Sequence, residues 1–250
     1  MLAARDVAFG PDERQRLDVY RPRIQVPGKP LPVIIFFYGG SWKTGTKAGY
    51  SWVARALAAR GFMVVVPDYR LHPKVRYPAF LEDGAAALRW TIAHARDFGG
   101  DPARLVLAGH SAGAYNAAML AYDPRWLGSE QKKVRGFIGL AGPYDFLPFD
   151  TDVAREVFGA YPDLPATQPV NFVDGSDPPA FLATAGKDDT VRPRNSDSLA
   201  AKLKAAGVEV ERVDYPKLGH VGILTALSKP FRGRAHVLDD LTAFAREVTE

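Results

Sequence analysis

Short apolar runs alternate along the chain with longer segments whose apolar residues recur at helical spacing. Continuous apolar runs of this length are typical of strands that are buried on both faces of a sheet. We expect such strands at residues 33–38, 62–67, 105–109, 137–141, 180–185 and 208–215. Helices are expected between and after them, at residues 50–60, 80–98, 112–122, 195–206 and 235–248. The pattern therefore predicts a regular succession of strand and helix.

Two further apolar runs near the N-terminus, residues 6–9 and 17–20, are separated by turn-forming residues. They predict a β-meander that enters the same sheet, which brings the expected number of strands to eight. Alternation of strand and helix predicts an α/β fold with a mostly parallel sheet and helices on both faces. The irregular stretch 144–179 is expected to cover a site rather than form a second domain. We therefore expect a single domain over residues 1–250, with its ligand at the carboxyl ends of the strands.

A serine lies between two glycines directly after one of the expected buried strands. Residues 109–113 read Gly-His-Ser-Ala-Gly, the pattern G-x-S-x-G, and the small-residue helix at 112–122 follows at once. A serine at such a strand-to-helix turn has a strained backbone and an exposed hydroxyl, and the start of the helix favours a developing oxyanion. Ser111 is the candidate nucleophile. The pattern alone can be accidental, so the rest of the chain must supply a base and an acid.

Histidine is the usual base for a serine nucleophile, and the chain contains five. His220 lies in a glycine-flanked loop directly after the strand at 208–215, at the expected carboxyl edge of the sheet. His110 adjoins Ser111, but neighbouring residues on a tight turn point in different directions. The other histidines are expected to be surface or packing residues, so His220 is the predicted base.

The acid that orients the base is expected in the loop after the strand at 180–185. Two adjacent aspartates, Asp188 and Asp189, lie there, and only one of them can face His220. We take Asp189 as the acid and keep Asp188 as the alternative. The order serine, aspartate, histidine along the chain is the order of α/β-hydrolases and differs from that of the chymotrypsin-like and subtilisin-like proteases.

An oxyanion hole requires backbone N–H groups aimed at the developing charge. The N–H of Ala112, directly after the serine, is one candidate donor. The others are expected in the glycine-containing loop at 38–42, which follows the strand at 33–38.

Composition removes several other function classes. Hydrophobic residues make up 47% of the chain and charged residues 24%, as in an ordinary globular protein. The net charge of +4 is spread along the chain without a basic stripe, so no nucleic-acid partner is expected. No apolar stretch has the length of a bilayer crossing. With no cysteine, disulfides, thiolate metal sites and a cysteine nucleophile are excluded. No metal or cofactor is expected, and residues 1–6 have no apolar signal core, which favours the cytoplasm unless a leader was removed.

From about Leu17 to the C-terminus the chain resembles the hormone-sensitive-lipase-like and arylformamidase-like (BD-FAE-like) esterases of the α/β-hydrolase superfamily. The resemblance is carried by several blocks in the family's order: residues 38–42, 68–71, 77–83, 99–102 and 109–114, and the loops containing Gly186 and His220. It implies an α/β-hydrolase fold. As a departure from the family, no long N-terminal cap precedes the first expected strand, so we expect little or no cap domain and a more open pocket than in capped relatives.

The resemblance also implies roles for individual residues. It implies Ser111, Asp189 and His220 as the catalytic triad, because the family's acid stands three residues after a glycine such as Gly186. It implies oxyanion donors from Gly40, Ser41 and Ala112. The family's oxyanion loop begins with histidine, and Tyr38 stands in that place here. We expect Tyr38 to brace the loop rather than to donate to the substrate. Candidate walls of the substrate pocket are Tyr38, Trp42, Tyr115 and Phe146.

The resulting hypothesis is a serine hydrolase that cleaves small or short-acyl carboxylic esters through an acyl-enzyme. An arylformamidase-type amide hydrolase would use the same groups and is the nearest alternative. A hydrolase fold used only as a binding module is the alternative from another class. The sequence does not predict the natural substrate or the oligomeric state.

Overall fold

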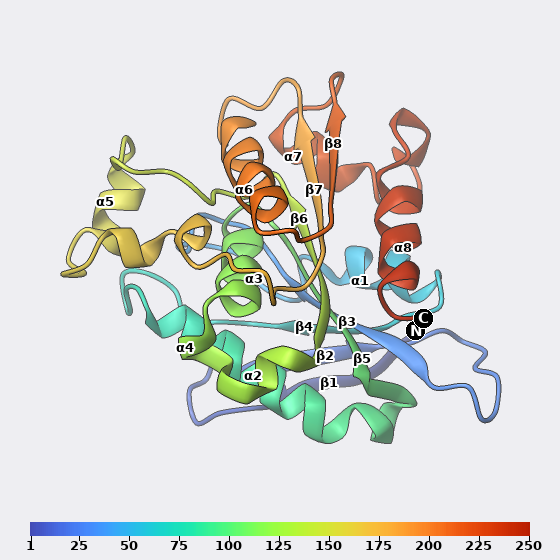
Figure 1. The fold of residues 1–250 in the computed structure, drawn as a ribbon. Coiled ribbons are helices and arrows are strands. Elements are labelled where there is room, and N and C mark those ends of the chain that lie inside the picture. The colour runs from blue at the N-terminus through green and yellow to red at the C-terminus, as the bar shows by residue number, and fades with distance from the viewer.

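The computed structural model describes all residues from Met1 to Glu250 and contains one eight-stranded sheet (Figure 1). The strand order is β1-β2-β4-β3-β5-β6-β7-β8. The strands are β1 (Leu2–Ala8), β2 (Arg16–Tyr20), β3 (Leu31–Phe37), β4 (Met63–Pro67), β5 (Gly100–His110), β6 (Val134–Leu140), β7 (Ala180–Ala185) and β8 (Val210–Tyr215). All eight expected strands are present. Their ends differ from the predicted ones by a few residues, most of all at the start of β1 and β5.

The sheet is mostly parallel, as predicted. Strand β2 pairs antiparallel with β1 and with β4, and every other neighbouring pair is parallel. The N-terminal meander therefore forms one edge of the sheet. The parallel strands carry the buried apolar runs, because helices cover both of their faces.

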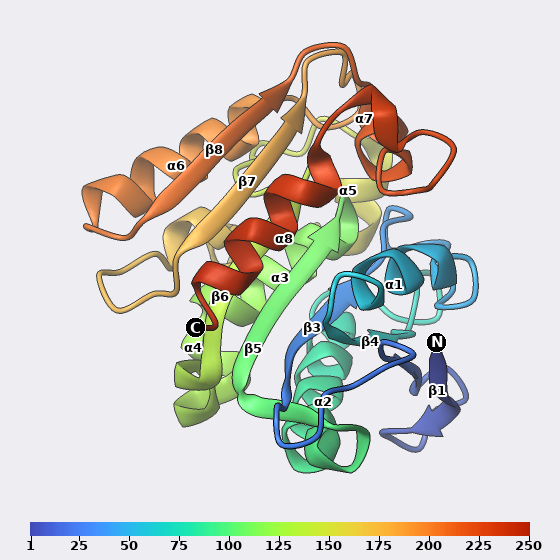
Figure 2. The same cartoon turned by 90° about the vertical axis from the view of Figure 1, so that its right-hand side faces the viewer.

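Helices α1 (Ser51–Ala58) and α8 (Val237–Glu247) pack on one face of the sheet, as Figures 1 and 2 show together. Helices α2 (Ala79–His94), α3 (Ala112–Tyr122) and α6 (Arg194–Ala205) cover the other face. All residues of α3 are buried, which explains its many small side chains. This helix lies directly against β5, β6 and β3, so a bulkier sequence would not fit.

Three short helices were not expected from the sequence: α4 (Pro124–Leu127), α5 (Asp152–Phe158) and α7 (His220–Thr225). They are too short to show a clear apolar period. Helix α5 begins at a cap formed by Thr151, whose hydroxyl accepts the N–H of Ala154 at 3.2 Å. It lies in the stretch 144–179, and this stretch contributes Phe146, Asp150 and Val153 to a cavity beside Ser111. The stretch that was expected to cover a site thus lines this cavity.

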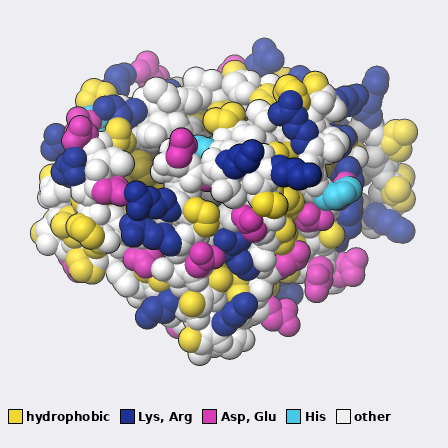
Figure 3. All heavy atoms as spheres, turned by 90° about the horizontal axis from the view of Figure 1, so that it is seen from above, with side chains coloured by type: hydrophobic (Ala, Val, Ile, Leu, Met, Phe, Trp, Pro, Cys, Tyr) yellow, Lys and Arg dark blue, Asp and Glu magenta, His cyan; other side chains and the backbone are white.

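Strands β7 and β8 end at the top of Figure 1, and Figure 3 shows the molecule from that side. Lysine and arginine side chains are interspersed there with aspartate and glutamate side chains. No helix combines the length and the apolar character needed to cross a bilayer.

Candidate active site

Ser111 occupies a strained turn between β5 and α3. Its backbone has φ 55° and ψ −126°, a conformation that residues other than glycine rarely adopt. The flanking glycines are required by close packing: a Cβ on Gly113 would lie 2.1 Å from the carbonyl oxygen of Phe37, and one on Gly109 would lie 2.3 Å from that of Gly113. The turn therefore brings β3, β5 and α3 together beneath the serine. This is the elbow geometry expected from the sequence.

The Ser111 hydroxyl meets His220 at the carboxyl edge of the sheet. Its Oγ lies 2.9 Å from His220 Nε2, and His220 Nδ1 lies 2.8 Å from Oδ2 of Asp188. A carboxylate only accepts hydrogen bonds, so Nδ1 carries the proton and Nε2 is free to accept from Ser111. The structure thus joins a hydroxyl, an imidazole and a carboxylate in one chain of hydrogen bonds.

The prediction that Asp189 faces His220 is wrong, and the alternative, Asp188, holds that position. The loop after β7 turns tightly, with the N–H of Asp188 donating to Ala185 at 3.0 Å. Neighbouring side chains on such a turn diverge, so the Asp188 side chain is buried against His220 while Asp189 is exposed. Asp189 accepts only a long bond of 3.4 Å from the hydroxyl of Thr190 and lies on the wall of the cavity.

The environment of Asp188 keeps it ionised. Burial by itself would raise the pKa of this carboxyl. The hydrogen bond from His220 and the N–H groups of Val191 and Thr190, which reach Oδ1 at 2.8 and 3.0 Å, act in the opposite direction and leave the pKa below its ordinary value. Asp188 can therefore stabilise a positive charge on His220.

Three backbone N–H groups near Ser111 donate to no other group of the protein. They belong to Gly40, Ser41 and Ala112, the donors predicted from the sequence. Ala112 is the first residue of α3, so its N–H is at the positive end of an eleven-residue helix. The loop that carries Gly40 and Ser41 packs onto Ser111, since a Cβ on Gly39 would lie 3.0 Å from Ser111 Cβ.

Tyr38 braces this loop from below and does not line the pocket, which corrects its place among the pocket walls. Its side chain is fully buried and stacks between the rings of Tyr50 and Tyr69, at centroid distances of 5.3 and 4.8 Å. Its hydroxyl donates to Asp68 Oδ1 at 2.7 Å and accepts from the guanidinium of Arg14 at 2.7 Å.

The same two charged residues also hold the far end of the loop. Asp68 accepts the N–H of Lys47 at 2.7 Å, and Arg14 donates to the carbonyl of Gly45 at 3.0 Å. Both ends of the segment that presents the candidate oxyanion donors are thus tied to one ion pair. From the sequence only Tyr38 was expected to brace the oxyanion loop, and its hydrogen-bond partners Arg14 and Asp68 were not predicted.

A cavity of about 380 Å³ adjoins Ser111. Trp42 and Phe146 are among its walls, as expected, and the indole N–H of Trp42 is held by Asn116 at 3.0 Å. Tyr115 is not a wall: it is fully buried behind Trp42, and its hydroxyl donates to the carbonyl of Thr167 at 2.7 Å. The charged residues on the walls are Asp150, Asp189, Arg192 and Arg194. The two negative and two positive charges balance.

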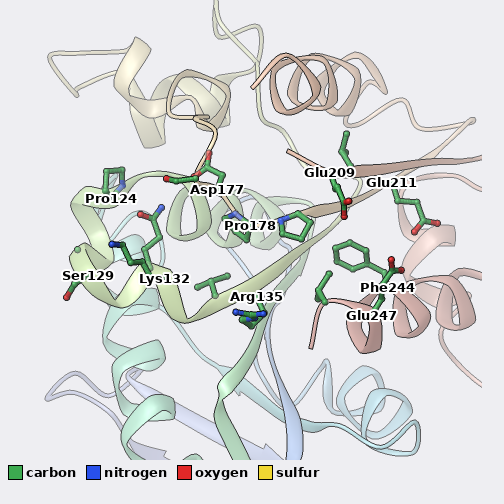
Figure 4. A pocket seen from close by; sticks show the side chains of 17 residues that line it. Pro124, Ser129, Lys132, Arg135, Asp177, Pro178, Glu209, Glu211, Phe244 and Glu247 are labelled. Carbon is green, nitrogen blue, oxygen red and sulfur yellow. The ribbon is translucent and has the colours of Figure 1, made fainter. Parts of the chain in front are cut away.

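A larger cavity of about 1180 Å³ lies at the opposite end of the sheet (Figure 4). It is lined by residues at the starts of β6 and β8, including Val134 and Val210, and contains no histidine. Burial raises the pKa of Asp177, one of its labelled residues, to about 7. It lacks a paired nucleophile and base, so the smaller cavity at Ser111 is the candidate active site.

The chain is similar to known proteins in both sequence and structure. The BD-FAE family model matches residues 17–203. Esterase LipC of Mycobacterium tuberculosis is 32% identical over 86% of this chain, and Carboxylesterase NlhH of the same organism is 34% identical over 82%. This chain covers 59% of LipC and 70% of NlhH, so its match spans only part of each relative.

Solved structures share the fold. A truncated carbohydrate esterase from gut microbiota superposes with a TM-score of 0.85 at 23% identity, over 98% of this chain and 95% of its own. Esterase 2 of Thermogutta terrifontis gives a TM-score of 0.81 at 23% identity, over 97% and 93%. The protein thus has the α/β-hydrolase fold, and the extent of the family match shows that the chain belongs to the BD-FAE family.

Proposed function

We propose that this protein is a serine hydrolase that cleaves carboxylic esters through an acyl-enzyme, with Ser111, His220 and Asp188 as its triad. The observation that carries the proposal is the hydrogen-bonded chain from the Ser111 hydroxyl through His220 to Asp188, at 2.9 and 2.8 Å, beside unpartnered backbone N–H groups. Relatives named esterase and carboxylesterase give independent support.

In the first half of the reaction, Ser111 Oγ attacks the ester carbonyl carbon while His220 Nε2 takes the hydroxyl proton. Asp188 stabilises the resulting imidazolium, and the N–H groups of Gly40, Ser41 and Ala112 bind the oxyanion of the tetrahedral intermediate. The bond to the leaving oxygen then breaks as His220 returns the proton to it. An acyl group remains on Ser111, and the alcohol departs.

In the second half, water replaces the alcohol. His220 takes a proton from the water as its oxygen attacks the acyl carbon, and a second tetrahedral intermediate forms in the same oxyanion site. Its collapse returns the proton to Ser111 Oγ and releases the carboxylic acid.

The cavity supports small, uncharged substrates. A volume of about 380 Å³ is near the lower end of the range of small-molecule sites. Trp42, Phe146 and Val153 offer apolar contact for a short acyl group, and the balanced charges of the walls favour no net charge on the leaving group. We therefore expect kcat/KM to be highest for short-chain esters.

A fluorophosphonate probe tests the nucleophile. Wild type should be labelled, Ser111→Ala should not, and Ser129→Ala, which alters an exposed serine at the distant cavity, should be labelled like wild type. Labelling that persists in Ser111→Ala would refute the assignment. A folded wild type that resists the probe and hydrolyses no ester would instead favour a binding module.

A panel of p-nitrophenyl esters from acetate to octanoate, with an N-formyl aryl amide beside them, tests the reaction class. The proposal expects ester hydrolysis that declines with acyl length. Faster cleavage of the formyl amide than of any ester would replace the proposal with the amide-hydrolase alternative.

A further inference from the structure

The imidazole of His110 lies at the junction of the parts of the candidate site. The residue is only 4% exposed, and its Nε2 is 2.9 Å from the backbone oxygen of His220. The two imidazole rings are in contact, with centroids 4.8 Å apart. On the other side, a Cβ on Gly39 would lie 3.1 Å from His110 Nδ1, so the ring also packs against the start of the oxyanion loop. His110 is covalently joined to Ser111 as well.

The contacts of His110 determine its protonation. A backbone carbonyl only accepts, so Nε2 must carry a proton and donate it to His220. Nδ1 is buried and has no partner. Burial, together with the nearby imidazole of His220, lowers the pKa of His110 to about 4. At neutral pH the ring is therefore an uncharged donor, and it does not contact Ser111 Oγ as a base.

The helix that carries His220 is held in the core by Ile223 and Leu224, three and four residues after the histidine. Helix α7 begins at His220 and has six residues, and it follows a loop at the edge of the molecule (Figure 2). His110, in contrast, ends β5, which pairs with β3 and β6 in the centre of the sheet. The bond from His110 therefore ties the first residue of α7 to a central strand of the sheet.

We propose that His110 is a positioning residue: its Nε2–H holds the backbone of His220 where the side chain reaches both Ser111 and Asp188. The proposal rests on the hydrolase function proposed above. A displacement of about 1 Å in an active site can lower a rate by about 100-fold. One neutral hydrogen bond should account for a smaller part, about tenfold in kcat, which corresponds to about 1.4 kcal/mol.

Two variants of similar shape separate the hydrogen bond from packing. The amide nitrogen of His110→Gln can occupy the place of Nε2 and donate to His220, whereas His110→Met fills similar space without a donor. We expect kcat on p-nitrophenyl acetate to fall about tenfold in His110→Met, with KM within twofold, and to fall no more than threefold in His110→Gln. His236→Met, at an exposed position, controls for the loss of a histidine. Thermal unfolding of each variant reports whether the fold is kept.

Proton NMR gives a readout that packing alone would not change. The Nδ1–H of His220, bonded to Asp188 at 2.8 Å, should give a downfield resonance in wild type and His110→Gln. It should broaden or shift upfield in His110→Met. Nitrogen-15 shifts of the wild type should also show His110 protonated at Nε2 and not at Nδ1, which requires no variant to fold.

Equal kcat in folded His110→Met and wild type would overturn the proposal, as would equal losses in the Met and Gln variants. So would an Nδ1-protonated His110 in the wild type. Failure of the hydrolase proposal itself looks different, because the wild type would then resist the fluorophosphonate probe and hydrolyse no ester.

Discussion

Replacing Asp188 with asparagine should nearly abolish ester hydrolysis without unfolding the protein. Oδ1 of Asp188 accepts two backbone N–H groups, at 2.8 and 3.0 Å, while Oδ2 faces His220. In Asp188→Asn the amide oxygen should keep the two N–H bonds, which points the NH₂ group at His220 Nδ1. His220 must then carry its proton on Nε2, where it cannot accept the proton of Ser111.

The magnitude follows from these contacts. Turning the amide around would lose two hydrogen bonds at about 1 kcal/mol each, so the productive tautomer is disfavoured by about 30-fold. Loss of a charged hydrogen bond to the imidazolium, about 1.5–3 kcal/mol, removes a further factor of about 10–100. We expect kcat to fall by about 10³. This is somewhat less than the factor of about 10⁴ known for the equivalent change in a serine protease.

The assay is steady-state hydrolysis of p-nitrophenyl acetate by Asp188→Asn and its neighbour variant Asp189→Asn, with thermal unfolding measured for both. The Asp189 side chain is exposed and makes only one long hydrogen bond, so its variant should keep kcat within about threefold. A large loss of kcat in Asp189→Asn with little in Asp188→Asn would refute the reasoning and restore the prediction made from the sequence.

Three further changes test other parts of the structure. Tyr38→Phe should lower kcat about fivefold with little change in KM, because it removes the hydrogen bond that Tyr38 donates to Asp68 and the one that it accepts from Arg14 beneath the oxyanion loop. Burst kinetics on p-nitrophenyl acetate would measure this loss, and an unchanged kcat would show that ring packing alone braces the loop. Gly113→Ala should lower the unfolding temperature by several degrees or prevent folding, because its Cβ would lie 2.1 Å from the carbonyl oxygen of Phe37. A soluble variant whose unfolding temperature in differential scanning calorimetry equals that of the wild type would contradict this. Asp177 has a pKa raised by burial to about 7, so ionisation lowers stability as pH rises from about 4 through 7. Asp177→Asn should therefore stabilise the fold at pH 8 by about 1 kcal/mol, a value discounted for partial exposure, and have little effect at pH 4; urea titrations giving an equal gain at both pH values would exclude this cause.

The architecture was predictable because its signals are local and redundant. Buried parallel strands such as β7 are uninterrupted apolar runs in the sequence, and the small residues that follow the elbow indicate helix α3. Helices α5 and α7 escaped prediction because six or seven residues give no period to detect. They form where tertiary contacts, rather than propensity, determine the backbone.

The site was predictable in its loops but not in the direction of each side chain. The carboxyl ends of β5, β7 and β8 had to bring Ser111, the aspartate loop and His220 together, whichever aspartate was used. The choice between Asp188 and Asp189 depends on the backbone torsions of one turn. Those torsions are fixed by contacts such as the hydrogen bonds from the N–H groups of Thr190 and Val191 to Asp188. The spacing of residues in the sequence does not predict such contacts.

The elbow turn also determines where the His110 side chain lies. Adjacent residues on a tight turn diverge, so His220 and not His110 meets the Ser111 hydroxyl. Divergence directs the His110 ring away from the hydroxyl and onto the backbone of His220, 2.9 Å away. A residue that faces away from the reacting atoms can still face the element that carries one of them. His110 therefore joins the strand that ends at the nucleophile to the helix that begins with the base.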